Sequence, residues 1–233
     1  LERLAKKGMP RAIVPLGNFD LMRSTGIATV DELDWWQSVR LSSNVTVTLV
    51  PAQHFSARTL WDRDRTLWGG FVISGPSGNV FFAGDTGYGP HFRDIALLFS
   101  PIRVALLPIA PFRPPQARES TRGNRSVVHL GPAEAVKAHR DLGGPLSVAA
   151  HFRVFRLGVE GFNDAVDVLA ASLKEHSLKP DAFVTPVIGQ AIKIPPPMLD
   201  ASLSPAGKEY SVGPILSFTG AGSSASHVTS VRD

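Results

Sequence analysis

The pattern of apolar and polar positions predicts strands and helices through most of the chain. Short apolar runs bounded by Gly, Pro or Asn are typical of strands, and apolar residues three or four apart are typical of helices. Strands are predicted at 12–16, 45–50, 67–74, 80–83, 104–109 and 146–150, with two more around Gly189 within 183–194. Helices are predicted at 1–8, 18–26, 91–99, 131–143 and 161–176. Strands come first and helices separate the later ones, which predicts an α/β fold with helices packed outside mixed sheets.

The strand predicted at 80–83 leads directly into a loop of sequence Gly-Asp-Thr-Gly at 84–87. Its four consecutive apolar residues predict a strand covered on both faces, because such a strand need not alternate. The glycines of the loop allow positive φ or close backbone approach around Asp85. Two interpretations of Asp85 remain open at this point. It is either a turn former that bonds its own backbone or a functional acid held by a rigid scaffold.

The strands at 67–74 and 80–83 are separated by Gly-Pro-Ser-Gly-Asn, which predicts a β-hairpin. Gly69 and Gly70 lie inside the first of these strands and predict a bulge or a close approach of two backbones. The adjacent Trp35 and Trp36 are interpreted as one core and one surface aromatic residue.

The chain divides into a domain over 1–194 and a tail over 195–233. The tail is rich in Pro, Ser and Gly, which predicts a disordered or loosely attached segment. Residues 111–126 carry prolines and arginines without an apolar period and predict an exposed, mobile loop. The sequence begins at Leu1 within a predicted helix, so we expect the domain to be incomplete at its N-terminus.

Composition narrows the function classes. The net charge is +4, but lysine and arginine are scattered, which excludes a nucleic-acid partner and suits an anionic substrate or membrane surface. There is no cysteine, so any metal must be held by His, Asp or Glu. No apolar stretch approaches the roughly 20 residues of a membrane helix, and no signal peptide is visible. We expect a cytoplasmic protein, with peripheral contact to a membrane.

Three predicted strands end in residues that can bind a metal, namely His54, Asp85 and His151. Strand ends are where α/β folds build their sites. Imidazole suits zinc, and a carboxylate can bridge two metal ions. A single histidine at a strand end is more often structural, and spacing alone does not show that the three residues converge.

The other histidines are weaker candidates. His139 and His176 fall on predicted helices and are expected to face solvent. His129 differs, because it stands just before a helix N-terminus, where an anion is favoured.

Several motifs in one order carry a resemblance to a known family. They are Leu-Asp-Trp-Trp at 33–36, Pro-Ala-Gln-His-Phe-Ser-Ala-Arg-Thr-Leu at 51–60, Leu-Trp-Gly-Gly-Phe at 67–71, Phe-Ala-Gly-Asp-Thr-Gly-Tyr at 82–88, His-Leu-Gly-Pro-Ala-Glu-Ala-Val at 129–136 and Ala-His-Phe at 150–152. Over residues 1–194 the chain resembles the metallo-β-lactamase superfamily, specifically the branch of N-acylphosphatidylethanolamine-hydrolysing phospholipase D.

This resemblance implies an αβ/βα sandwich with two zinc ions at the edge of its sheets. His54 matches the histidine that completes the first zinc site, and His151 the one that completes the second. Asp85 matches the catalytic carboxylate that bridges both ions, and His129 matches a histidine near the substrate phosphate. The implied substrate is a phospholipid-like or small phosphodiester, attacked by hydroxide formed from a shared water.

The chain also departs from the family pattern. The family's main ligand signature, His-x-His-x-Asp-His, is absent from the sequence, and Phe152-Arg153 replaces the usual Trp-Gly. The segment at 111–126 lacks the aromatic-rich Glu-Pro-Arg-Trp motif. Because stable zinc sites need three or four protein ligands, we expect this chain to be catalytically impaired. The alternatives are a lactonase of the same fold and a non-catalytic fragment or pseudoenzyme.

Overall fold

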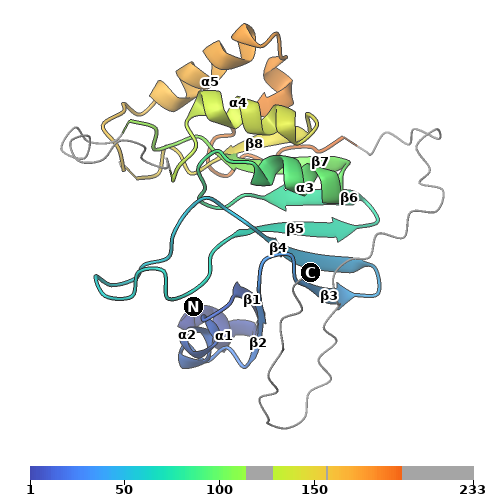
Figure 1. The fold of residues 1–233 in the computed structure, drawn as a ribbon, viewed down its shortest axis with the longest axis vertical. Helices are drawn as coiled ribbons and strands as arrows, with labels where there is room; N and C mark the ends of the chain where they lie inside the picture. Colours follow the sequence, from blue (N-terminus) through green and yellow to red (C-terminus); the bar gives the residue numbers. More distant parts are fainter. Residues whose placement is uncertain (114–127, 156, 196–233) are drawn as a thin grey trace, which may run out of the picture.

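The computed structural model describes residues 1–113, 128–155 and 157–195 (Figure 1). Its helices are α1 (Glu2–Gly8), α2 (Phe19–Ser24), α3 (His91–Phe99), α4 (Pro132–Asp141) and α5 (Asp164–Glu175), with a short 3-10 turn at Pro180–Ala182. Its strands are β1 (Arg11–Pro15), β2 (Thr29–Leu33), β3 (Ser38–Ser42), β4 (Val45–Val50), β5 (Gly70–Gly75), β6 (Gly78–Phe82), β7 (Ile102–Pro108), β8 (Leu146–Ala150) and β9 (Phe183–Val184). The α/β class predicted from the sequence is confirmed.

The larger sheet has seven strands in the order β3-β4-β5-β6-β7-β8-β9. Strands β3 to β6 pair antiparallel, whereas β6 to β9 pair parallel. This change of direction follows from the connections, because short turns suit antiparallel neighbours and parallel neighbours need a crossover. Helices α3, α4 and α5 supply those crossovers. A separate parallel pair, β1-β2, lies with α1 and α2 at the end of the molecule opposite α4 and α5 (Figure 1).

The two faces of the larger sheet contribute to different cores. Val50 of β4 belongs to the main core, which includes Phe81 and the inner residues of α3, α4 and α5. Its neighbour Leu49 points the opposite way and belongs to a second core with Leu33 of β2. Successive side chains of a strand face opposite sides, so the helices cover one face and the β1-β2 pair covers part of the other. None of the described helices is long and apolar enough to cross a membrane.

The glycines within the predicted strand at 67–74 lie where two backbones meet closely, as expected. A Cβ added at Gly69 would lie 2.5 Å from the carbonyl oxygen of Val50, and one at Gly70 would lie 2.7 Å from that of Phe82. Both contacts are closer than van der Waals distance and both involve backbone atoms, which cannot rotate away. The sequence signal therefore marks a close approach of β5 to its neighbouring strands.

Substituting Gly69→Ala is expected to lower the free energy of unfolding by about 1–3 kcal/mol, because the added methyl group forces a backbone shift. Urea denaturation measures this change. Gly8→Ala is the matched control, since a Cβ at Gly8 meets nothing within 4 Å. Equal unfolding midpoints for the two variants would contradict the close approach.

Several sequence predictions are corrected by the structure. Strand β6 is not covered on both faces: Phe81 is 1% exposed, but Phe82 is 43% exposed, because no described element packs fully over that face. The prediction of two strands in 183–194 is wrong, since only β9 forms there. Strands β2 and β3 were not predicted, and β5 begins at Gly70 instead of at residue 67.

Individual side chains also differ from expectation. Trp35 and Trp36 are both half-buried, and each packs against a different core. His139 was expected to face solvent but is 2% exposed, because its side of α4 lies against the sheet, where it pairs with the hydroxyl of Ser147 at 2.9 Å. The predicted loop at 111–126 and tail at 195–233 fall almost wholly outside the described residues.

Candidate metal centre

Strand directions bring three sequence-predicted residues to one edge of the sheet. β4 and β6 are each antiparallel to β5 and therefore run in the same direction. β8 shares that direction through β7. His54, Asp85 and His151 follow the C-terminal ends of β4, β6 and β8 respectively. The convergence that spacing alone could not show is thus a consequence of the topology.

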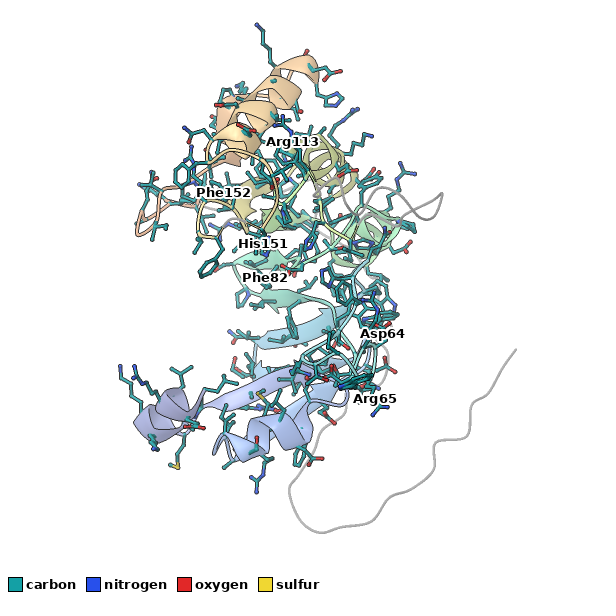
Figure 2. The ribbon with its side chains drawn as sticks, turned by 90° about the vertical axis from the view of Figure 1, so that its left-hand side faces the viewer. Asp64, Arg65, Phe82, Arg113, His151 and Phe152 are labelled. Carbon is teal, nitrogen blue, oxygen red and sulfur yellow. The ribbon has the colours of Figure 1, made fainter. Side chains whose placement is uncertain are left out.

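His151, which is labelled in Figure 2, lies against the carboxylate of Asp85. The distance between its Nε2 and Asp85 Oδ1 is 3.4 Å. Its Nδ1 lies 2.7 Å from the carbonyl oxygen of Ala110, and a carbonyl can only accept, so Nδ1 carries the hydrogen. The other ring nitrogen, Nε2, is the one that faces Asp85. His151 also adopts φ 56°, a costly conformation for a non-glycine residue and one that clusters at functional sites.

His54 is held in the same tautomer by its own neighbour. Its Nδ1 lies 2.9 Å from the carbonyl oxygen of Phe55 and must donate to it. Its ring stacks on the Phe55 ring with centroids 4.7 Å apart, and the Arg63 guanidinium covers Phe55 at 4.0 Å. The Nε2 of His54 is buried and has no hydrogen-bond partner. The side chain is therefore fixed with a free lone pair on a buried nitrogen.

His129 lies between the other two histidines. Its ring centroid is 5.1 Å from that of His54 and 5.6 Å from that of His151. Its Nδ1 is buried without a hydrogen-bond partner. Burial lowers the pKa of His129, and the neighbouring His54 lowers it further, which favours the neutral ring. The local sequence pattern gave His129 only a position before a helix, and its place near the metal-binding candidates was implied by the family resemblance alone.

The donor set fits a divalent cation. Ligand atoms of His54, Asp85 and His129 lie within 4.8 Å of one another. Imidazole nitrogens with a carboxylate are the donors that zinc and similar ions prefer. In addition, both His54 and His151 donate their other ring N–H to a backbone carbonyl, which is the usual support of metal-binding histidines. Buried nitrogens without partners are costly unless something binds them.

A cavity of about 490 Å³ opens beside His151. Its wall is largely apolar and includes Phe155 and Phe162, with the charged side chains of Arg153 and Glu160 among them. An apolar cavity with a few polar groups is typical of a substrate site. Sequence reasoning did not single out this cavity, because most of its wall is formed by the loop that follows β8, which has no periodicity.

The structure is thus a mixed sheet with helices on one face and, at its edge, a histidine-carboxylate cluster that fits a metal ion. A family model described as the β-lactamase superfamily domain matches residues 2–152. The chain belongs to this superfamily. The resemblance found in the sequence is thereby confirmed at the level of the superfamily.

Relatives and solved structures agree with this assignment. An uncharacterized protein of Mycobacterium tuberculosis is 36% identical over 203 residues, covering 84% of this chain and 50% of the relative. N-acyl-phosphatidylethanolamine-hydrolyzing phospholipase D 1 of Caenorhabditis elegans is 30% identical over 188 residues, which cover 76% of this chain and 51% of that relative. A metal-dependent hydrolase of Methanopyrus kandleri is 29% identical over 161 residues, which cover 66% of this chain and 62% of that relative.

Among solved structures, a metallo hydrolase from Ignicoccus hospitalis superposes with a TM-score of 0.55 at 17% identity, covering 80% of this chain and 68% of that one. Isothiocyanate hydrolase from Delia radicum gut bacteria superposes with a TM-score of 0.53 at 16% identity, covering 78% of this chain and 67% of that one. These likenesses show the fold alone. The chain spans about half the length of the mycobacterial and nematode relatives.

Proposed function

We propose that this chain carries the metal centre of a zinc-dependent phosphodiesterase of the N-acylphosphatidylethanolamine phospholipase D type. The observation that carries the proposal is the convergence of His54, Asp85, His129 and His151 with buried, unpartnered imidazole nitrogens. The relative from Caenorhabditis elegans supports the substrate class, because its name describes hydrolysis of a phospholipid diester.

The residues of the centre have distinct tasks. His54 and His151 offer Nε2 lone pairs in a tautomer that backbone carbonyls hold fixed. Asp85 supplies negative charge beside His151, and its 45% exposed side chain remains open to solvent and substrate. A divalent cation bound there supplies Lewis-acid chemistry, lowering the pKa of water and polarising a phosphoryl oxygen. His129 stands just before the N-terminus of α4, where an anion is favoured, and we assign it contact with the substrate phosphate, as the family resemblance implies.

The number of donors limits what this chain does by itself. Its sequence holds no His-x-His-x-Asp-His signature, and the described residues bring three imidazoles and one carboxylate together. Three of these donors would hold one ion and leave its fourth position open for water, but the set does not suffice for two ions. We therefore propose that the 233-residue chain binds a single zinc ion and hydrolyses phosphodiesters slowly.

Isothermal titration of the metal-free chain with zinc, followed by hydrolysis assays, tests this function. We expect one zinc ion per chain and slow cleavage of bis(4-nitrophenyl) phosphate that stops when a chelator is added. The same preparation is assayed against a γ-lactone and against N-acylphosphatidylethanolamine vesicles. Lactone cleavage without phosphodiester cleavage would identify a lactonase, and zinc binding without any hydrolysis would contradict the catalytic proposal.

A further inference from the structure

The two loops that carry His54 and Asp85 are joined directly behind the metal centre. Gln53 and Gly87 form an isolated antiparallel bridge, in which the Gly87 N–H donates to the Gln53 carbonyl oxygen at 2.9 Å. His54 follows Gln53 in the chain, and Asp85 lies just before Thr86. Whatever fixes this bridge also fixes the separation of the two candidate ligands.

The hydroxyl of Thr86 makes a second link between the two loops, and its one hydrogen and both lone pairs are engaged. Its Oγ1 donates to the Gly87 carbonyl oxygen at 2.8 Å and accepts from the Gln53 N–H at 2.9 Å. The third neighbour is His91 Nε2, at 3.2 Å. A hydroxyl has one hydrogen and two lone pairs. Since the hydrogen is directed to Gly87, His91 must be the second donor.

This count assigns the tautomer of His91. Its Nε2 carries the hydrogen, and its Nδ1 is left as an acceptor. His91 is the first residue of helix α3, and it is 7% exposed. Burial lowers the pKa of His91 to about 4, against a smaller opposing effect of Asp94, so the ring is neutral near pH 7.

The surrounding packing leaves little freedom in this arrangement. Thr86 is 1% exposed. A Cβ added at Gly89 would lie 2.8 Å from Gln53 Oε1 and 3.0 Å from His91 Nδ1, so the loop passes close over both side chains. Helix α3 is itself anchored in the main core by Phe92 and Ile95. The position of the loops is thus coupled to the rigid helix layer through one imidazole.

We propose that His91 and Thr86 are positioning residues, which hold the His54 and Asp85 loops at the separation required for both side chains to bind one metal ion. Neither residue donates to the ion. The proposal rests on the metal centre proposed above and adds the part of the structure that preorganises it. Loss of a hydrogen-bond partner behind metal ligands typically weakens metal affinity by roughly 10–100-fold.

The test compares His91→Phe and His91→Gln with His139→Phe as the matched control. His139 is also a buried histidine paired with a hydroxyl, that of Ser147, but it lies in α4 away from these loops. Zinc dissociation constants are measured by chelator competition, and the geometry of the centre by the visible absorption spectrum of bound cobalt(II). His91→Phe is expected to weaken zinc binding roughly 10–100-fold and to alter the cobalt spectrum.

Glutamine retains a donor for Thr86, so His91→Gln is expected to restore most of the affinity. His139→Phe is expected to lower the unfolding midpoint while leaving the dissociation constant and the cobalt spectrum unchanged. Should His91→Phe fail to fold, the pair Thr86→Val and Thr86→Ser carries the same comparison, because valine removes the hydroxyl and serine keeps it. A folded His91→Phe or Thr86→Val variant with wild-type affinity and spectrum overturns the proposal.

A metal-free measurement separates this inference from the proposed function. Hydrogen exchange of the Gln53 and Gly87 amides reports the bridge directly, and we expect His91→Phe to speed their exchange in the absence of metal. A wild-type chain that binds no zinc would contradict the proposed function but would leave the role of His91 in holding the bridge untouched. Unchanged exchange in the variant would sink the positioning role whatever the wild type binds.

Discussion

Substituting Asp85→Asn is expected to abolish most zinc binding by the chain. The loss should exceed the roughly 10–100-fold that removal of an outer hydrogen-bond partner causes, since here a ligand itself is changed. Asparagine keeps the shape of the side chain, but it removes the carboxylate that lies near the imidazoles of His54 and His129. Chelator competition on the purified variant measures the dissociation constant.

Asp167→Asn is the matched control, because it is the same substitution at an exposed position of α5. It should bind zinc as the wild type does. Asp85 lies in a glycine-framed turn, so the sequence also allowed a purely structural role for it. Wild-type affinity in Asp85→Asn, with a lowered unfolding midpoint, would show that this structural role is the correct one.

The candidate site could be predicted from sequence wherever a residue follows a strand. His54, Asp85 and His151 each come after an apolar run, and strands of common direction end at one edge. His129 follows residues 114–127, which carry no periodic pattern, so only the family resemblance, and not the local pattern, indicated that it lies near that edge. The contact of His91 with Thr86, five residues earlier, depends on how the loop before α3 folds back, and no sequence pattern indicated it.

His139 shows a signal that was present but was given too little weight. It lies four positions after Ala135 and three before Leu142, both of which are fully or nearly fully buried. Helical periodicity therefore puts it on the buried stripe of α4. Its residue type suggested solvent, but periodicity decides the face, and Ser147 satisfies the imidazole there.

Strand β2 could not be predicted because its sequence, Thr-Val-Asp-Glu-Leu, places two acids in a short segment. Such residues are depleted in strands, yet β-propensity depends strongly on context. Here the context is the parallel pairing with β1 and the bidentate contact of Arg11 with Asp31, at 2.6 and 2.9 Å. A partner distant in the chain overrides the local preference.

Substituting Phe81→Ala is expected to lower the free energy of unfolding by about 3–5 kcal/mol, the usual cost of removing a buried phenylalanine. Phe81 is 1% exposed and meets Phe92 of α3 edge to face, with centroids 6.2 Å apart. Its removal leaves a cavity between the sheet and the helices, in a core too closely packed to collapse fully. Urea denaturation of the variant gives the change.

Phe82→Ala is the internal control, because it removes the same side chain from the next residue of the same strand. Phe82 is 43% exposed on the opposite face of the sheet, so we expect a distinctly smaller loss than for Phe81. Equal losses would mean that a further layer covers Phe82 and that β6 is buried on both faces, as its unbroken apolar run had suggested. Because Asp85 follows this strand, zinc affinity of the folded Phe81→Ala variant also shows how far the site depends on the core beneath it.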